Sequence, residues 1–543
     1  MPLTRRSGLL AGAAAGLSLA SRAAFAQAAS IRGGTLVYLE QQAHTPLYPP
    51  AGGFYPNGGI LNQITDKLTY QNPRTLEIEP WIAESWEINA DATEYVFRLR
   101  PGVTFSDGTP LNAEAVARNF DIYGFGNTAL RLPVSEVISN YERGEVVDPL
   151  TVRFRFSRPA PGFLQGTSVI GSGLVSLGTL AQNFDAFGDP RKVVGSGPFV
   201  ATGFVLGREV TLTARRDYTW GPVRHPHQGR ALLDGIRYVV TGEDSVRIGA
   251  LLAGQAHVIR QLQAYDESQV ASRGFRIYAP STRGVNNSVV FRPDNPLVAD
   301  LRVRRALLHA TNAREIVDTL FSPNYPRATS IIASTAQGYV DLSSKLNHDL
   351  ALASCLLDEA GWAPGPGGVR QKDGRRLELT AYESPPQPQN RETLQLIAQQ
   401  WQRVGVRLTV LPGDAGSRVA DNLDPAKTPV SPAMVGRADP DVIRSQYHPL
   451  TRNVLLQTGG VSDRVRDFND ARLNALLDGI ASEPDRAKRL DLVRQVQEYV
   501  LEQAYAIPIF EEPQVFAASA RVRDLGFEAV GRPSFYATWI APR

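Results

Sequence analysis

The sequence predicts a multidomain protein in which strands and helices alternate, and three observations support this. The chain has 543 residues, which is more than one hydrophobic core normally serves, so two or three domains are expected. Residues 80–120 contain two strand patterns, two tight turns and a helix pattern in succession. Further along, TVRFRFSR at 151–158 has the two-residue period of a strand, and Leu394, Ile397 and Trp401 have the spacing of a helical core stripe.

The block at 80–120 is the most strongly patterned part of the chain. Within EYVFRLR, large apolar residues alternate with Val96, Arg98 and Arg100, and Pro101-Gly102 then reverses the chain. A second turn, SDGTP at 106–110, combines side-chain capping with a glycine and a proline. Asn112 is expected to cap a helix whose Val116 and Phe120 share one face.

The first residues predict an export signal, cleaved after residue 26. Arg5 and Arg6 precede an apolar run from Leu9 to Ala20, and Ala24-Phe25-Ala26 has the form of a cleavage site. The run is too short for a stable membrane anchor, and no cysteine follows it that would accept a lipid. We expect a periplasmic protein; Thr4-Arg5-Arg6 leaves twin-arginine and general secretion both open.

Charge and cysteine content exclude several classes of protein. The chain has 57 Lys and Arg against 54 Asp and Glu, and the three leader arginines account for the difference. The exported chain is therefore formally neutral, without a basic run that would indicate nucleic-acid binding. A single cysteine, Cys355, excludes an internal disulfide, and its leucine-rich surroundings predict that it is buried.

Two short motifs raise the question of an enzyme or a metal site. Gly195-Ser196-Gly197 is followed by Pro198 and a strand pattern, whereas a nucleophile elbow needs G-x-S-x-G between strand and helix. His225-Pro226-His227 has no cysteine or acidic residue nearby at ligand spacing, which favours a solvated loop. We therefore expect no catalytic residues, no cofactor and no metal ligands of the protein's own.

Several motifs together resemble one family. PWIAESW, followed by EYVFRLRPGVTFSDGTPL, resembles a conserved block of the family 5 extracellular solute-binding proteins of ABC importers, which include peptide, nickel and opine receptors. VVGSGPF at 193–199, LALASCLLDEAGW at 350–362 and LQLIAQQWQRVGV at 394–406 resemble further motifs of that family. The resemblance runs from about Ile31 to Phe535.

The resemblance implies an α/β fold of the periplasmic-binding-protein type, in its large three-domain form (type II), with two lobes hinged about a ligand cleft. The expected domains are 27–60 with 187–279 and 490–543 (domain I), 61–186 (domain II, peripheral) and 280–489 (domain III, the second lobe). The lobes should be joined by crossovers near Ala279–Gly284 and Ala504–Glu511.

Candidate ligand-binding residues come from the loops that line the cleft in that family. The loop HTPLYPPAGGFYPNGG carries Tyr48, Phe54 and Tyr55; composition alone favours packing for these rings, and the resemblance favours ligand contact. Where the chain enters the third domain, the resemblance adds Arg283, Asn286 and Asn287.

The chain departs from peptide-binding members at both charged anchors. Their W-x-x-D-x-x-D-P loop holds the peptide ammonium, and the corresponding SPAMVGRADPD places Gly436 at the binding Asp and Ala433 at the Trp, if Asp439-Pro440 is matched. Ser384 falls at the basic position that holds the carboxylate. Unpaired buried charges cost several kcal/mol, so a simple dipeptide is not the expected solute.

A larger or differently charged solute is expected instead. Tyr382 and Tyr447 are candidates to stack on it, and Arg437 and Arg283 are candidates to bind an anionic group. The expected partners are a small solute (peptide-like, opine-like, a glycoside or a chelate) and an ABC permease in the inner membrane, with the receptor acting as a monomer. A metal-chelate receptor of the same fold, a receptor serving a chemoreceptor, and an exported hydrolase remain alternatives.

Overall fold

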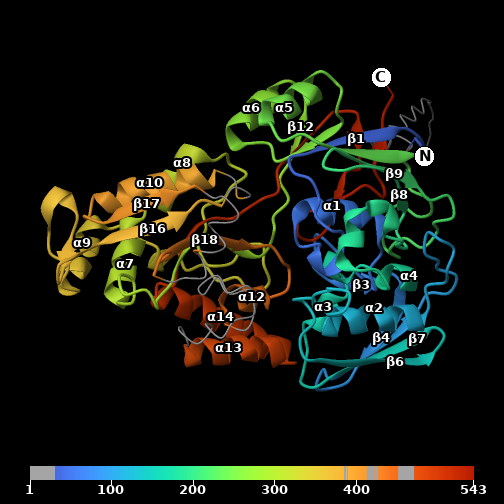
Figure 1. The fold of residues 1–543 in the computed structure, drawn as a ribbon, viewed down its shortest axis with the longest axis horizontal. Coiled ribbons are helices and arrows are strands. Elements are labelled where there is room, and N and C mark those ends of the chain that lie inside the picture. The colour runs from blue at the N-terminus through green and yellow to red at the C-terminus, as the bar shows by residue number, and fades with distance from the viewer. Residues whose placement is uncertain are drawn as a thin grey trace, which may run out of the picture.

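The computed structural model places two lobes side by side (Figure 1) and describes residues 31–384, 387, 389–412, 421, 426–449 and 470–542. The predicted export signal, with its twin-arginine motif, lies outside the described residues. Among the helices described there is none long and apolar enough to cross a membrane.

The first lobe is built on a seven-stranded mixed sheet. Its strands are, in spatial order, β12 (Arg276–Tyr278), β20 (Phe516–Ala518), β11 (Val258–Arg260), β1 (Thr35–Glu40), β10 (Gly235–Val240), β9 (Glu209–Ala214) and β8 (Phe199–Val205). β1 runs parallel to both of its neighbours, and the other pairings are antiparallel. The accompanying helices are α1 (Tyr55–Ile64), α5 (Asp244–Leu252) and α6 (Ala264–Ser272).

The strongly patterned block forms a second sheet in the first lobe, as predicted. This antiparallel sheet has the order β4 (Ala83–Ile88), β5 (Glu94–Leu99), β7 (Thr151–Phe156) and β6 (Tyr141–Asp148), and α2 (Ala113–Phe125) packs against β6 and β7. The side chain of Asn112 accepts a hydrogen bond from the backbone N–H of Ala115 (2.9 Å), which confirms the predicted cap. Val116 and Phe120 are fully buried.

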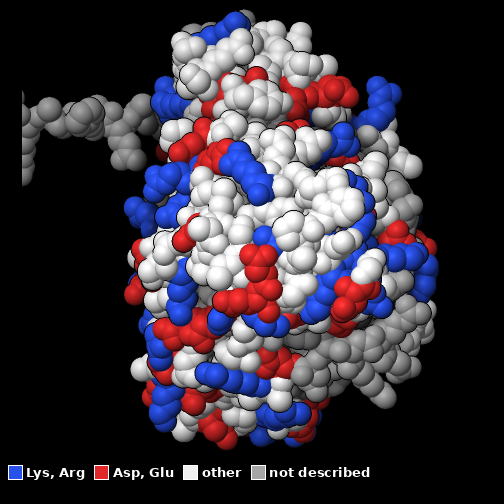
Figure 2. Space-filling view, turned by 90° about the vertical axis from the view of Figure 1, so that its left-hand side faces the viewer, with Lys and Arg blue, Asp and Glu red and all other residues white. Residues whose placement is uncertain are grey.

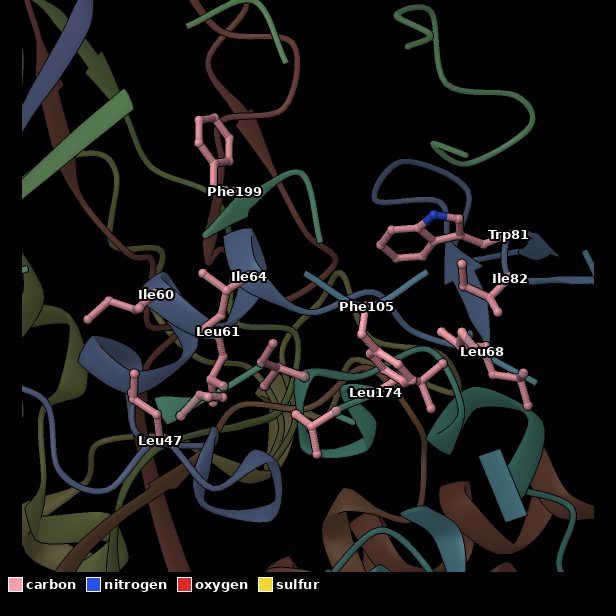
Figure 3. Close-up of a cluster of buried hydrophobic side chains, with 14 of the residues drawn as sticks. Leu47, Ile60, Leu61, Ile64, Leu68, Trp81, Ile82, Phe105, Leu174 and Phe199 are labelled. Carbon is pink, nitrogen blue, oxygen red and sulfur yellow. The ribbon is translucent and has the colours of Figure 1, made fainter. Parts of the chain in front are cut away.

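Shorter elements complete the first lobe. They are β2 (Thr69–Gln71), β3 (Ile78–Pro80), α3 (Phe163–Gly166), α4 (Leu177–Leu180), β21 (Val522–Arg523), β22 (Gly526–Phe527), β23 (Pro533–Ser534) and β24 (Trp539–Ile540). Figure 3 shows part of the core that these elements share with the sheets: leucine and isoleucine side chains of α1 pack together with Leu47, and Trp81 lies at one edge of the cluster.

The second lobe has two small sheets and most of the long helices. One sheet has the order β18 (Val430–Val435), β13 (Val285–Phe291), β19 (Ala506–Phe510), and the other pairs β16 (Glu378–Tyr382) with β17 (Arg407–Leu411) in parallel. The remaining elements are α7 (Leu301–Ala310), α8 (Ala313–Leu320), α9 (Leu350–Glu359), β14 (Gln371–Lys372), β15 (Arg375–Arg376), α10 (Asn390–Gln402), α12 (Val442–Tyr447), α13 (Ala471–Ser482) and α14 (Arg486–Glu502). On the face of this lobe seen in Figure 2, basic and acidic side chains are interspersed.

Two crossovers connect the lobes, and the second lies later than expected. Residues 279–284 lead from β12 of the large sheet to β13 of the second lobe, as predicted. β19, however, pairs with β13, so the predicted segment Ala504–Glu511 belongs mostly to the second lobe, and the return occurs at 511–515, before β20. The predicted domain boundaries otherwise stay a prediction; the one at 490 falls inside α14, which packs on α13.

Three local expectations differ from the structure. Cys355 is exposed on α9 rather than buried, because Ala353 and Leu357 form the inner face of that helix. The aromatic loop after β1 is shorter than expected, since α1 already begins at Tyr55. The rings of His225 and His227 are half-buried against Tyr536, with centroids 5.1 and 4.8 Å from its ring, rather than solvated.

Gly284, in the first crossover, should not tolerate a side chain. A Cβ there would lie 1.8 Å from the carbonyl oxygen of Val435, a backbone atom that cannot move aside without disturbing the β13–β18 pairing. We expect Gly284→Ala to lower the free energy of unfolding by about 1–3 kcal/mol, measured by urea unfolding.

Gly249→Ala is the matched control for this substitution. Gly249 lies within α5 with open space around its Cβ position, so alanine should raise stability by about 0.5–1 kcal/mol through its better helix propensity. Equal effects of the two substitutions would contradict the steric argument.

Candidate ligand site between the lobes

The lobes meet where the loop 436–441 of the second lobe approaches α1 of the first. The Tyr55 hydroxyl donates a hydrogen bond to the carbonyl oxygen of Val530 (2.8 Å). A Cβ on Gly436 would lie 3.2 Å from the Tyr55 hydroxyl oxygen and 3.2 Å from Cβ of Thr282. Glycine at 436 therefore allows the second-lobe backbone to lie close to Tyr55; we call this contact region the interlobe seam (residues 53–55, 282–283, 436–441 and 528–532).

Two buried arginines, Arg437 and Arg532, lie in the seam, and each has side-chain nitrogen atoms without a hydrogen-bond partner among the described residues. Arg437 donates from Nη2 to Oδ1 of Asp441 (2.6 Å), but its Nε and Nη1 are buried and have no hydrogen-bond partner among the described residues. The guanidinium of Arg532 lies 4.7 Å from the centre of the Tyr55 ring and is paired with Glu528 (2.7 Å), while its Nε has no partner in the same part of the chain. Unmade hydrogen bonds of buried charged groups are costly, so these N–H groups are candidate ligand contacts.

A compact acid–base cluster lies beside Arg437. Arg489 forms a two-pronged ion pair with Asp439 (2.6 and 3.2 Å). Burial raises the pKa of Asp439, but the charge of Arg489 and the hydrogen bonds from Arg489 and Asp441 together outweigh burial and hold that pKa below the usual value. Burial raises the pKa of Asp441 to about 6, against the opposing charge of Arg437 and with the help of the nearby Asp439.

First-lobe backbone reaches this cluster at Gly162. A Cβ there would lie 3.3 Å from Nη2 of Arg489 and 3.5 Å from Oδ1 of Asp439. The lobes are thus in contact on both sides of the seam, since Arg283 also reaches across and donates from Nη2 to the carbonyl oxygen of Pro73 (2.6 Å).

A chain of buried polar groups joins the large sheet to the crossovers. Arg260 donates to both carboxylate oxygens of Glu40 (2.8 and 2.9 Å) and to Oε1 of Gln514 (2.9 Å). Gln514 donates in turn to Glu512 (3.2 Å), which also accepts from the side chain of Asn287 on β13. We call this chain the hinge network, because it links β1 and β11 through the second crossover to the second lobe.

The other predicted site residues lie in different surroundings. Tyr48 and Tyr447 are buried in hydrophobic cores, and Tyr48 packs its ring against Tyr123 and Phe187, as composition alone had favoured. Asn286 is buried and donates to the carbonyl oxygen of Ser330 (2.9 Å). We therefore leave these three residues out of the proposed site.

Tyr382 and Ser384 lie outside the seam, and Phe54 lies in it without a described contact of its own side chain. The Tyr382 hydroxyl donates to Asp421 (2.6 Å), and the backbone N–H of Ser384 donates to Asn390 (2.6 Å). Phe54 is half-buried at the start of α1, next to Gly53, whose carbonyl oxygen accepts from Arg532 (2.9 Å). Their part in ligand binding stays a prediction.

Sequence reasoning missed Arg260, Glu512 and Arg532. A usable signal existed, because one or two charged residues stand in largely apolar stretches such as VIRQL and PIFEEPQVF. Charged residues are rarely buried without a partner, so these positions indicated buried pairs. Which charges pair with each other depends on how distant parts of the chain pack together, and the sequence does not predict it.

The two motifs that raised chemical questions are accounted for locally. The side chain of Ser196 is fully buried, and its hydroxyl accepts a hydrogen bond from the backbone N–H of Asp66 (3.3 Å). No group of three or more His, Cys, Asp or Glu side chains that could hold a metal ion occurs among the residues described.

Replacing Glu512 should change how stability depends on pH. Burial raises the pKa of Glu512 from its usual 4.5 to about 7, although Asn287, Arg260 and Gln514 oppose the shift. Between these values the unfolded chain has lost the proton and the folded protein retains it, so stability falls as pH rises from about 4.5 to 7, by up to about 3 kcal/mol. Glu512→Gln, which mimics the protonated acid, should remove this loss, measured as urea unfolding at pH 5 and pH 8.

Glu87→Gln, at a side chain that is 75% exposed, is the control and should leave the pH dependence unchanged. If Glu512→Gln and the wild type respond equally to pH, the carboxyl of Glu512 does not retain its proton in the folded protein.

Comparison with known proteins agrees with this architecture. Residues 77–445 match the family model described as "Bacterial extracellular solute-binding proteins, family 5 Middle". The dipeptide-binding protein of Escherichia coli (strain K12) is 24% identical over 98% of both chains, and the glutathione-binding protein GsiB of the same strain is 26% identical over 68% of both chains.

Solved structures share the fold. NikA from Brucella suis, in complex with Fe(III)-EDTA, has a TM-score of 0.77 at 22% identity and covers 93% of this chain and 100% of its own. AgaA from A. tumefacien R10, in complex with agropinic acid, has a TM-score of 0.75 at 22% identity, with coverage of 94% and 99%. With two lobes, two crossovers and a family match over most of its length, the chain belongs to the bacterial extracellular solute-binding proteins of family 5.

Proposed function

We propose that this protein is the solute-binding component of an ABC importer, and that the solute it binds in the interlobe seam carries an anionic group and is not a simple dipeptide. The observation that carries the proposal is the buried guanidinium of Arg437, next to Gly436, whose Nε and Nη1 have no hydrogen-bond partner within the described ranges. A carboxylate or similar group on the solute would supply the missing acceptors.

The acidic residues of the seam argue against an ammonium anchor. Asp439 is paired with Arg489, Asp441 with Arg437, and Glu528 with Arg532. Binding a free ammonium would require breaking one of these pairs and leaving a buried arginine uncompensated, at a cost of about 3–5 kcal/mol. Gly436 itself offers no side chain.

The two lobes close around a solute because the solute makes contacts with both of them. Tyr55 and Arg532 belong to the first lobe and Arg437 to the second, so a solute between them contacts both only when the lobes are together. Its greater affinity for that arrangement shifts the population toward the closed form, which is the form a permease would recognise. Export by the signal at residues 1–26, a periplasmic location and a monomeric state belong to the same proposal.

Relatives with charged ligands support the anionic solute. NikA was solved with Fe(III)-EDTA and AgaA with agropinic acid, and other relatives are named for dipeptides and glutathione. A metal chelate is the second candidate solute, since a chelator would bring its own ligands to a protein that shows no metal-binding cluster among its described residues.

A solute panel with a thermal-unfolding readout tests the proposal. The panel contains dipeptides, oligopeptides, opines, oligosaccharides, sulfonates, and metal ions with and without chelators. A ligand present at one hundred times its Kd should add about 2.7 kcal/mol to stability, enough for a clear rise in Tm. We expect an anionic non-peptide solute or a chelate to raise Tm, and dipeptides to leave it unchanged.

Arg437→Met identifies the site of the effect. The variant should lose the Tm rise given by the anionic solute, whereas Arg276→Met, at an exposed position on β12, should retain it. A clear Tm rise with dipeptides would overturn the solute class proposed here, and no rise with any solute of the panel would count against the receptor function.

A further inference from the structure

The first lobe contains a cavity that the interlobe seam does not explain. It has a volume of about 280 Å³ and is lined entirely by first-lobe residues from 62–81, 165–169, 198–226 and 526–536. A cavity of about 150 Å³ is enough to bind benzene, so this one has room for an aromatic ring with polar substituents. We call it the first-lobe pocket.

Aromatic rings form much of its wall. Tyr70 and Trp81 meet edge to face with centroids 6.1 Å apart, and Tyr218 and Tyr536 do so at 5.4 Å. Three of these rings direct their polar atoms to other partners: Trp81 Nε1 to the carbonyl oxygen of Trp220 (3.1 Å), the Tyr536 hydroxyl to that of Gly229 (2.8 Å), and the Tyr218 hydroxyl to Asp66 (3.1 Å). The wall therefore offers fixed apolar ring surfaces to an occupant.

A buried cation lines the same pocket. Lys67 is only 3% exposed; its Nζ donates to the side chain of Asn62 and lies 5.2 Å from the centre of the Trp81 ring. Burial lowers the pKa of Lys67 to about 8 even though Glu528 and Asp66 oppose the shift. No carboxylate of the described residues is close enough to form an ion pair with it, so the ammonium is incompletely compensated.

A buried acceptor lines it as well. Glu79 is 5% exposed, and its Oε1 accepts a hydrogen bond from Asn72 (3.0 Å). Its Oε2 is buried and has no hydrogen-bond partner in the described part of the chain. A buried carboxylate oxygen left unpaired is destabilising by about 1–3 kcal/mol or more, which a donor on an occupant would relieve.

We propose that the first-lobe pocket is a second binding site, which takes a small aromatic molecule bearing both a carboxylate and a hydrogen-bond donor. The ring packs against Trp81, Tyr218 and Tyr536, the carboxylate pairs with Lys67, and the donor bonds to Glu79.

The pocket adjoins the seam and shares Glu528, Ala529 and Val530 with it, but neither Tyr55 nor Arg437 lines the pocket. At the same border Pro73 accepts a hydrogen bond from Arg283, and Val530 packs in a buried cluster with Ala438 of the second lobe. The proposal does not rest on the solute proposed for the seam, and the two can fail independently.

Isothermal titration calorimetry of the purified protein with four probes tests the proposal. L-Phenylalanine and 4-hydroxyphenylacetate carry both polar groups, 3-phenylpropionate lacks the donor, and 2-phenylethylamine lacks the carboxylate. We expect the first two to bind with one molecule per protein, and the other two to bind at least roughly tenfold more weakly, or about 1.4 kcal/mol.

Two substitutions assign the polar contacts. Lys67→Met should remove the preference for probes with a carboxylate, and Glu79→Gln should weaken 4-hydroxyphenylacetate while leaving 3-phenylpropionate unchanged. Lys345→Met, at an exposed lysine of the second lobe, is the control for loss of a positive charge. If Lys67→Met does not fold, as judged by circular dichroism, Glu79→Gln still decides the question.

Three outcomes would overturn the proposal. The first is that no probe binds at millimolar concentration. The second is that the probes bind equally well to the wild type and to the folded pocket variants. The third is that Arg437→Met abolishes binding of the probes, which would place them in the seam.

Discussion

The two-lobed arrangement depends on the buried ion pair between Glu40 and Arg260 and on the hydrogen bonds that continue from it. Both residues lie on adjacent parallel strands of the large sheet, and both side chains are withdrawn from water. The attraction within a buried ion pair offsets its desolvation cost only when the remaining donors are also hydrogen-bonded. Arg260 donates a further hydrogen bond to Gln514, so the stability of the pair depends on the crossover that returns from the second lobe.

This dependence explains how the hinge can be both ordered and movable. Glu512 receives hydrogen bonds from Gln514 on one side and from Asn287 on the other, so the first lobe, the crossover and β13 share one carboxyl group. The crossover also has apolar packing, because Val515 belongs to one buried cluster with Ile259 of the first lobe and Phe510 of the second. Lobes joined by two crossovers can rotate about them.

The seam and the first-lobe pocket present different chemistry within the same lobe pair. In the seam, Arg437 and Arg532 have side-chain nitrogen atoms without a partner among the described residues, and the nearby acids are already paired with arginines. In the pocket, Lys67 forms no ion pair with a described carboxylate, and Oε2 of Glu79 has no hydrogen-bond partner among the described residues. Aromatic rings line the same cavity. The first environment suits an anionic group held between lobes, and the second suits a small amphipathic molecule held within one lobe.

The sequence by itself determined the local structure and the family. The alternation at 94–99, the cap at Asn112 and the stripe ending at Trp401 are local patterns, and the structure confirms each of them. The local pattern did not predict burial correctly where it depends on what distant parts of the chain pack against the residue. Leu352 and Cys355 have a helical apolar spacing, yet that side of α9 faces solvent, and Tyr48 in a loop rich in ligand-like aromatics is buried in a core.

Only the tertiary structure decided where the crossovers lie and which buried charges share a site. The sequence predicts a crossover at Ala504–Glu511, but β19 within it pairs with β13, a contact between segments more than 200 residues apart that no local signal specifies. In the same way, Arg532 and the second-lobe residue Gly436 both lie close to Tyr55 only because the chain crosses between the lobes twice. Propensity and periodicity act over a few residues, whereas the electrostatics of the seam depend on contacts between distant parts of the chain.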